Sequence, residues 1–219
     1  FEKIGFNINE GDKIALIAPN GTGKTSLMRI LAGKDKSDSG GKIMFLKDIR
    51  IAFLEQEYDF DPEKTLFDQI MSSSTEFTKG LEQENLWEYE RRVVKSLTEF
   101  NLPDPDQKMK ELSGGEIKRI EIASVLARSD TKLCIFDEPE AGIDLWSFAG
   151  LIEAFQKLKT KNSGSILIIS HQERILNIAD EIVVIADGKV KARGTRQEIM
   201  PTLLADEKAA HCPRGKEVY

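Results

Sequence analysis

Short apolar runs recur along the 219-residue chain, and polar or glycine-containing segments separate them. Runs of this kind, alternating with segments of helical periodicity, predict strands that alternate with helices. That order predicts an α/β fold with a largely parallel central sheet. Asp187 and Gly188 separate the last two runs and predict an antiparallel hairpin, because Asp-Gly favours a two-residue turn. The expected strands are residues 1–9, 14–17, 42–46, 49–54, 132–136, 165–169, 181–186 and 189–192.

A charged segment, residues 58–110, interrupts this alternation and has a helical composition. Thr65 and Asp68 resemble a capping box at a helix start, and a longer helix with one apolar stripe is expected at residues 81–100. We interpret the segment as a helical lobe inserted into one domain. The remaining expected helices are residues 27–32, 117–128, 146–159, 174–179 and 195–204. The expected division is a core of residues 1–56 and 111–204, the lobe at 58–110, and a C-terminal tail at 205–219.

One stretch between a strand and a helix has the pattern of a phosphate-binding loop. Residues 18–26 read Ala-Pro-Asn-Gly-Thr-Gly-Lys-Thr-Ser. Backbone N–H groups of such a loop attract an anion, Lys24 reaches toward terminal phosphates, and the Thr25 hydroxyl suits Mg²⁺. Ala18 stands where the motif carries its first glycine, which matters only if that turn needs a left-handed backbone. The residues expected to hold the phosphates are Asn20, Gly21, Thr22, Gly23, Lys24, Thr25 and Ser26.

Polar side chains follow three of the expected strands. Asp137 and Glu138 come directly after one strand, and Gln56 and His171 follow two others. The carboxyl ends of parallel strands form the ligand-binding edge of an α/β sheet, so we expect these groups near the phosphate loop. One carboxylate suits Mg²⁺, and the next suits the activation of water.

A second helix start has features of an anion site. Ser113 is a suitable N-cap, and Gly114 and Gly115 after it would expose backbone N–H groups. Taken alone, the segment is equally typical of an ordinary capped helix after a Gly-Gly linker. Both alternatives stay open at this point.

Composition excludes several classes of protein. The net charge of −6 does not favour nucleic acid as a partner. The longest apolar runs are far too short to cross a membrane. Two cysteines, Cys134 and Cys212, provide neither a disulfide framework nor metal-site spacing, which is consistent with a cytoplasmic protein.

The order of these motifs strongly resembles the nucleotide-binding domain of ABC ATPases over nearly the whole chain. Leu-Ser-Gly-Gly-Glu at residues 112–116 is similar to the ABC signature motif and is the most specific part of the likeness. The resemblance implies a P-loop NTPase fold with an ABC-type ATPase core. It also implies ATP and Mg²⁺ as cofactors and hydrolysis of ATP to ADP and phosphate. In this family two domains close head to tail over two ATP molecules.

The resemblance assigns a role to each motif residue by its position. Glu138 would be the general base, and His171 would contact the γ-phosphate. The implied catalytic residues are Lys24, Gln56, Glu138 and His171. The implied Mg²⁺ ligands are Thr25, Gln56 and Asp137. ATP on the opposing subunit would meet Ser113, Gly114 and Gly115, and Asp144 would organise the dimer interface.

Two further features differ from the family pattern. Glu140 follows Asp-Glu-Pro where Thr or Ser is usual. The aromatic residue that commonly stacks on adenine would lie upstream of Phe1.

The two halves of the chain resemble different branches of the family. Residues 1–112 look like the first domain of ABC-F proteins, the translation-associated branch. The part from Glu116 onward looks more like single-domain ATPases near the Suf-type iron–sulfur assembly group. We therefore hypothesise a chimera joined near the signature motif, which predicts that a natural relative would not align evenly across the join.

Two functions remain in competition. The leading interpretation is a cytoplasmic Mg²⁺-dependent ATPase that closes on a second nucleotide-binding domain and drives a protein partner. That partner would be a membrane subunit, an iron–sulfur assembly protein or the ribosome. The alternative is a nucleotide-gated binding module with vestigial hydrolysis. A structural-maintenance-type head would need a long coiled coil between Gln56 and Ser113, and this interval is too short for one.

Overall fold

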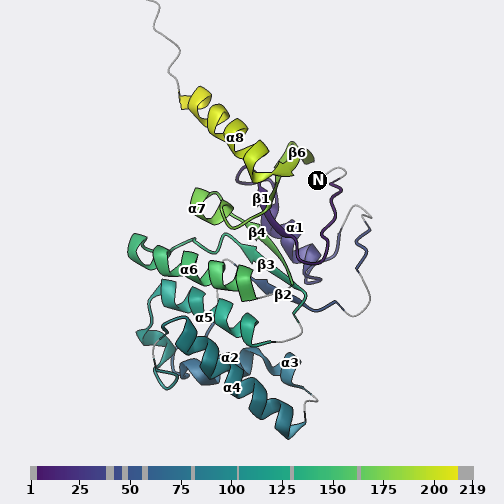
Figure 1. Ribbon diagram of the computed structural model, residues 1–219. Helices are drawn as coiled ribbons and strands as arrows, with labels where there is room; N and C mark the ends of the chain where they lie inside the picture. The colour runs from purple at the N-terminus through teal and green to yellow at the C-terminus, as the bar shows by residue number, and fades with distance from the viewer. Residues whose placement is uncertain are drawn as a thin grey trace, which may run out of the picture.

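A six-stranded sheet forms the centre of the protein, as a computed structural model shows (Figure 1). The structure describes residues 4–37, 42–45, 49–55, 59–79, 82–102, 104–128, 131–161 and 164–211. The strand order is β2-β3-β4-β1-β5-β6. All neighbouring strands pair in parallel except β5 and β6, which form the predicted antiparallel hairpin. The strands are β1 (Lys13–Ile17), β2 (Ile51–Leu54), β3 (Leu133–Asp137), β4 (Ser165–Ile169), β5 (Glu181–Ala186) and β6 (Lys189–Thr195).

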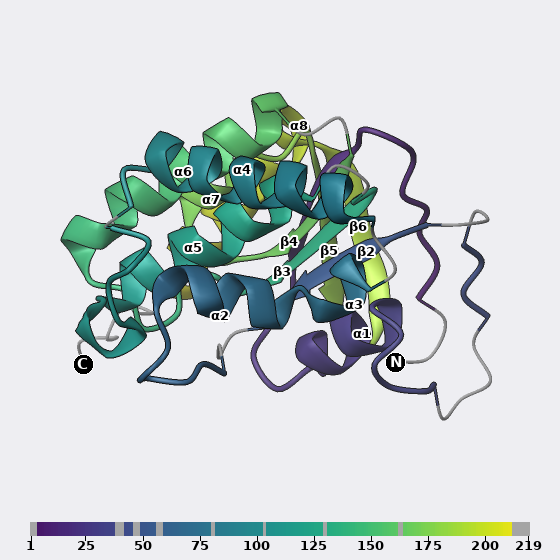
Figure 2. The same cartoon turned by 90° about the horizontal axis from the view of Figure 1, so that it is seen from below.

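Both faces of the sheet are covered, which explains why its parallel strands are continuously apolar. Successive side chains of β1 point to opposite faces. Ile14 and Leu16 pack in the cluster that contains Met28 of α1 (Lys24–Leu31), whereas Ala15 packs in the cluster that contains residues of α5 (Gly114–Ala127) and α6 (Leu145–Lys161). Figures 1 and 2 show α1 on one side of the sheet and α5 and α6 on the other.

The helices between β2 and α5 lie at the end of the molecule opposite α8 (Figure 1). They are α2 (Leu66–Ser73), α3 (Thr75–Thr78) and α4 (Gln83–Glu99), followed by the short 3₁₀ helix η1 (Met109–Glu111). The two ends of this segment pair with each other, because Leu66 N donates to Gln107 O at 2.9 Å and Met109 N donates to Lys64 O at 3.0 Å. Thr65 caps α2 by accepting from Asp68 N at 3.1 Å.

The remaining helices are α7 (Glu173–Leu176) and α8 (Arg196–His211). We expected the last helix to end near residue 204, but α8 continues to His211. No helix among the described residues is long and apolar enough to span a membrane.

Two predicted strands are wrong for the residues that the structure describes. Residues 4–9 form no strand, although Ile4, Phe6 and Ile8 pack against the core as their alternation suggested. A side chain, and not a neighbouring strand, satisfies one of the backbone carbonyls there, because Ser165 Oγ donates to Asn9 O at 2.7 Å. Residues 42–45 also form no strand, and Met44 is 91% exposed, so this apolar run does not contribute to the core.

Candidate nucleotide site

The carboxyl ends of β1, β3 and β4 bring most of the predicted phosphate and catalytic residues together. The three strands are adjacent in the order β3-β4-β1 and run parallel. The phosphate loop follows β1, Asp137 ends β3, and His171 follows β4 after one residue. Neighbouring parallel strands therefore place these groups at one edge of the sheet, as the sequence predicted.

The backbone of the predicted phosphate loop is left-handed at two glycines. Gly21 and Gly23 adopt positive φ angles of 76° and 84°, which glycine tolerates without strain. Ala18 does not, because the described non-glycine residues with positive φ are Asn101, Glu138 and Asp187. The substitution of alanine for the first motif glycine is thus compatible with this turn. Exposed positions in the loop and the first turn of α1 include Asn20, Gly21, Thr25 and Ser26.

The Lys24 ammonium is the centre of the site. The Lys24 side chain is 7% exposed, and its Nζ atom lies 3.1 Å from Glu138 Oε1. It donates to Ala18 O at 3.0 Å and to Asn20 Oδ1 at 2.9 Å, and it lies 2.8 Å from His171 Nε2. To accept from Lys24, Nε2 of His171 must be unprotonated. One cation thus joins the phosphate loop to the residues that follow β3 and β4.

Asp137 has the properties of a ligand for a cation. The residue is 1% exposed, and its Oδ2 atom has no hydrogen-bond partner among the described residues. Burial raises the pKa of its carboxyl, while a hydrogen bond from Thr25 opposes that rise. A buried carboxylate with an unused oxygen beside a threonine hydroxyl fits Mg²⁺, which takes hard oxygen ligands.

Mg²⁺ would depend on the nucleotide for part of its coordination. The described residues contain no group of three or more His, Cys, Asp or Glu side chains that could hold a metal ion. Mg²⁺ in nucleotide enzymes is commonly bound through one or two protein ligands together with substrate phosphates and water. Gln56, the third predicted ligand, lies outside the described residues.

Glu138 is held in an unusual backbone conformation. Its φ angle is +44°, a value that a non-glycine residue rarely adopts and that stores strain. Two backbone hydrogen bonds hold it there: Glu138 N donates to Ile169 O at 3.1 Å, and Ala141 N donates to Glu138 O at 2.9 Å. The carboxylate is thereby directed toward Lys24, and Glu138 Oε1 lies 3.8 Å from His171 Nε2.

The predicted signature residues lie in a separate part of the described structure. Ser113 caps α5 in a reciprocal capping box with Glu116: Ser113 N donates to Glu116 Oε2 at 2.8 Å, and Glu116 N donates to Ser113 Oγ at 3.3 Å. The helix therefore begins at Gly114, three residues before the predicted start. Among the described residues, the side-chain hydrogen bonds of Ser113 join it to Glu116 and not to Lys24 or Glu138.

Asp144 lies beside the signature residues. It caps α6 by accepting from Trp146 N and Ser147 N, both at 2.9 Å. The hydrogen bonds from Ser147 and the Trp146 backbone lower the pKa of its carboxyl. The start of α6 touches the start of α5, because a Cβ atom on Gly115 would meet Ser147.

Sequence reasoning missed a set of contacts around Glu55. Its carboxylate accepts from Arg29 Nη1 of α1 at 2.7 Å, and its backbone O accepts from Lys118 Nζ of α5 at 2.9 Å. The residue before Gln56 thus links the helix of the phosphate loop to the signature helix. Lys118 also pairs with Glu121 at 3.1 Å, and burial raises the pKa of Glu121 to about 7.

A second missed contact involves Glu140. Its Oε1 atom accepts from Ser170 Oγ at 2.5 Å. Both residues follow the carboxyl ends of adjacent parallel strands, and such ends meet at one edge of the sheet. The same rule predicted that Asp137 and His171 lie together, and it was the signal from which this pair could have been predicted.

Comparison with known proteins places these features in one family. The profile of the family described as ABC transporter matches residues 1–141. An ABC transporter ATP-binding protein of Pyrococcus abyssi is 32% identical over 195 residues, which are 84% of this chain and 74% of that protein. A spermidine/putrescine import ATP-binding protein of Mesoplasma florum is 33% identical over 207 residues, which are 90% of this chain and 57% of that protein.

Solved structures have the same fold. A nucleotide-free ATP-binding cassette from an ABC transporter superposes with a TM-score of 0.75 at 27% identity, covering 97% of this chain and 92% of that one.

The hypothesis of two joined halves gains no support. The alignment with the Mesoplasma florum protein spans 207 residues and therefore runs across the suggested join near residues 112–116. The resemblance to the ABC-F branch is supported in part. The ATP-binding protein Uup of Haemophilus influenzae is 33% identical over 186 residues, which are 83% of this chain and 27% of that protein. That alignment also extends beyond the first half, and the Suf-type likeness finds no counterpart in these relatives.

The contact between α5 and α6 predicts an asymmetric effect of alanine at the two signature glycines. A Cβ atom at Gly115 would lie 2.2 Å from Ser147 Cβ, whereas one at Gly114 would meet Gly142 O at 3.7 Å. We expect Gly115→Ala to lower the free energy of unfolding by about 1–3 kcal/mol, because overpacking forces the helices apart. Gly114→Ala is the matched control and should change it by less than about 0.5 kcal/mol. Chemical denaturation measures both, and equal values for the two variants would contradict the steric argument.

Proposed function

Because the chain belongs to the ABC transporter family, we propose that it is an Mg²⁺-dependent ATPase subunit that closes head to tail on a second nucleotide-binding domain. The observation that carries this proposal is the meeting of Lys24 with Glu138 and His171 at the end of the phosphate loop. The chain spans 57% of the spermidine/putrescine import ATP-binding protein that it matches, so the activity and partners of the whole protein are part of the proposal.

The phosphate loop would bind the nucleotide with groups that it already presents. Backbone N–H groups of residues 20–26 and the positive end of α1 attract the phosphates. Lys24 would exchange its contacts with Asn20 and Glu138 for contacts with phosphate oxygens. Its ammonium would then pair with the substrate instead of with the protein. Thr25 and Asp137 would hold Mg²⁺, whose positive charge would neutralise part of the negative charge of the phosphates.

Hydrolysis requires a base beside the γ-phosphate. Water attacks the γ-phosphorus, the bond from that phosphorus to the bridging oxygen of ADP breaks, and the proton of the water passes to the Glu138 carboxylate. When Lys24 binds the phosphates, it would no longer pair with Glu138 Oε1, and that oxygen would be able to accept the proton. His171, exposed to 44% of its side-chain surface, would contact the γ-phosphate. Positioning and charge neutralisation supply most of the catalysis in phosphoryl transfer.

The separation of the signature residues from Lys24 supports a two-subunit site. Ser113 and Gly114 are exposed at the start of α5 and free to meet a second nucleotide. Asp144 lies next to them, followed by Leu145 and Trp146, which are 77% and 89% exposed. Large apolar side chains with that exposure are typical of a surface that another protein covers.

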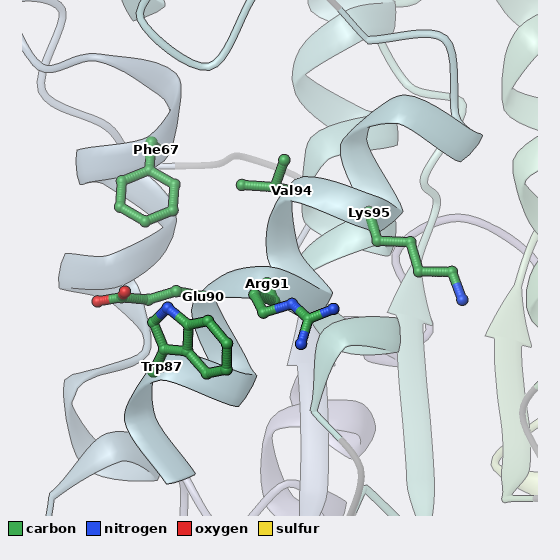
Figure 3. Close-up of a pocket in the computed structure, with 6 residues that line it drawn as sticks. All are labelled: Phe67, Trp87, Glu90, Arg91, Val94 and Lys95. Carbon is green, nitrogen blue, oxygen red and sulfur yellow. The ribbon is translucent and has the colours of Figure 1, made fainter. Parts of the chain in front are cut away.

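The helices α2 and α4 would receive the protein partner. A shallow pocket there is lined by Phe67, Trp87, Glu90, Arg91, Val94 and Lys95. Figure 3 shows Phe67 on α2 and Val94 on the neighbouring α4, with Trp87 and Arg91 farther along α4. Trp87 is 58% exposed and Arg91 lies 4.9 Å from its ring. An exposed tryptophan beside an arginine has the composition of an interface centre.

We assign that partner to a membrane subunit of a transporter, at the cytoplasmic face. Transport is what the names of the Pyrococcus abyssi and Mesoplasma florum relatives describe. An iron–sulfur assembly protein and the ribosome are the other partners that the same ATPase core would serve. Co-purification with a membrane protein would support the assignment, and co-sedimentation with ribosomes would overturn it.

The proposed base leads to a direct kinetic prediction. Glu138→Gln keeps the size of the side chain and removes its ability to take a proton. We expect kcat for ATP to fall by about 10²-fold or more, the usual contribution of a general base. Steady-state phosphate release with Mg²⁺ measures it. Glu173→Gln is the matched control, because Glu173 is exposed two residues after His171 and should keep the wild-type rate. Equal rates for Glu138→Gln and wild type would remove the base and favour the nucleotide-gated binding module.

Closure of two subunits predicts a change around Trp146. In Glu138→Gln, ATP should double the molar mass measured by light scattering. In the Trp87→Phe background, the fluorescence of Trp146 should shift to shorter wavelength and become less accessible to acrylamide, because the partner covers a side chain that is now 89% exposed. Trp146→Phe, which leaves Trp87 as the reporter, should show neither change. A monomer with bound ATP would contradict self-closure.

A further inference from the structure

We infer that Glu140 is a positioning residue: its carboxyl holds the segment that carries His171 against the segment that carries Glu138. The inference rests on the proposed ATPase function and adds a residue to that site. Glu140 follows β3 after Glu138 and Pro139, and Ser170 directly precedes His171 after β4.

Glu140 contacts the His171 segment through the hydroxyl of Ser170. Its Oε1 atom accepts from Ser170 Oγ at 2.5 Å, a short hydrogen bond typical of a hydroxyl donating to a carboxylate. Burial raises the pKa of the Glu140 carboxyl, and the hydrogen bond from Ser170 and the nearby backbone of Glu140 and His171 oppose that rise. Ser170 itself is 0% exposed, so this contact is shielded from water.

The Ser170 hydroxyl passes the restraint onward along the chain. It accepts from Gln172 N at 3.0 Å while donating to Glu140. The residues on both sides of His171 are therefore fixed to one hydroxyl, and that hydroxyl is fixed to Glu140. His171 gains its place 2.8 Å from Lys24 through a segment that Glu140 restrains.

The restraint acts on both sides of the site. Glu138 and Glu140 belong to the same turn, in which Ala141 N donates to Glu138 O at 2.9 Å. Glu138 also donates through its backbone N to Ile169 O at 3.1 Å. The Glu140–Ser170 contact is a side-chain clamp added to this backbone contact. Two contacts between the segment that carries Glu138 and the segment that carries His171 fix their relative orientation. A single contact would let the two segments rotate about it.

The second carboxyl oxygen of Glu140 is buried and has no hydrogen-bond partner among the described residues. A buried polar atom without a partner costs stability, so burial of this side chain is not explained by folding alone. The unpartnered oxygen of Glu140 thus has a local cost, which is consistent with a residue retained for the position of its neighbours.

Kinetics of Glu140→Ala tests the inference. Loss of the clamp should lower kcat for ATP about tenfold and leave KM within about twofold, since small misplacements of catalytic groups reduce the rate and the phosphate loop is untouched. Glu140→Gln keeps an acceptor for Ser170 and should retain at least half of the wild-type kcat. If Glu140 only stabilised the fold, its substitution would lower the melting temperature but would not lower kcat while leaving KM unchanged.

The other end of the clamp gives an independent variant. Ser170→Ala should reduce kcat to a similar extent, and the double variant Glu140→Ala, Ser170→Ala should be no slower than the slower of the two. Ser124→Ala is the matched control: Ser124 is also buried, donates to Glu121 O at 2.7 Å within α5, and should keep the wild-type kcat. If Glu140→Ala does not fold, Ser170→Ala carries the same test.

The outcomes separate this inference from the proposed function. If wild type hydrolyses ATP, Glu138→Gln does not, and both Glu140→Ala and Ser170→Ala keep the wild-type kcat, the inference is wrong and the function stands. If the two losses multiply in the double variant, the residues act independently and the clamp is also wrong. If wild type has no Mg²⁺-dependent ATPase activity, the function fails and the inference fails with it.

Discussion

The buried ammonium of Lys24 is the interaction on which the nucleotide site depends. An ammonium on a side chain that is only 7% exposed must be paired, because removing a charge from water is costly. Its partners come from three places: carbonyl and amide oxygens of the phosphate loop, the carboxylate of Glu138 and the imidazole of His171. The same charge therefore joins the three parts of the site. In the proposed function, the binding of nucleotide is an exchange of partners at Lys24 rather than the burial of a new charge.

The sheet makes this meeting possible. Because β4 lies between β3 and β1 and all three run parallel, their carboxyl ends deliver Asp137, His171 and the phosphate loop to one edge. The strained backbone of Glu138 then turns its carboxylate toward Lys24. Glu55 joins α1, β2 and α5 at the same edge. Through Glu55, α5, which begins with the predicted signature residues, is thus connected to α1, which follows the phosphate loop.

The sequence was sufficient where one local rule dominates. Apolar runs located β1, β3, β4 and the hairpin, and the phosphate-loop pattern located α1. It was insufficient where packing overrides pattern: Ile4, Phe6 and Ile8 alternate like a strand and pack against the core without pairing, and Met44 lies in an apolar run yet is 91% exposed. Long-range polar pairs such as Glu140 with Ser170, 30 residues apart, have no local signature, because only the register of adjacent strands brings them together.

A structure of the wild-type chain with Mg²⁺ and a non-hydrolysable ATP analogue tests the partner exchange at Lys24 most directly. The account predicts that Lys24 Nζ leaves Glu138 and Asn20 for phosphate oxygens, and that Asp137 and Thr25 lie beside the metal ion. A nucleotide bound while Lys24 keeps its contacts with Ala18, Asn20 and Glu138 would contradict it.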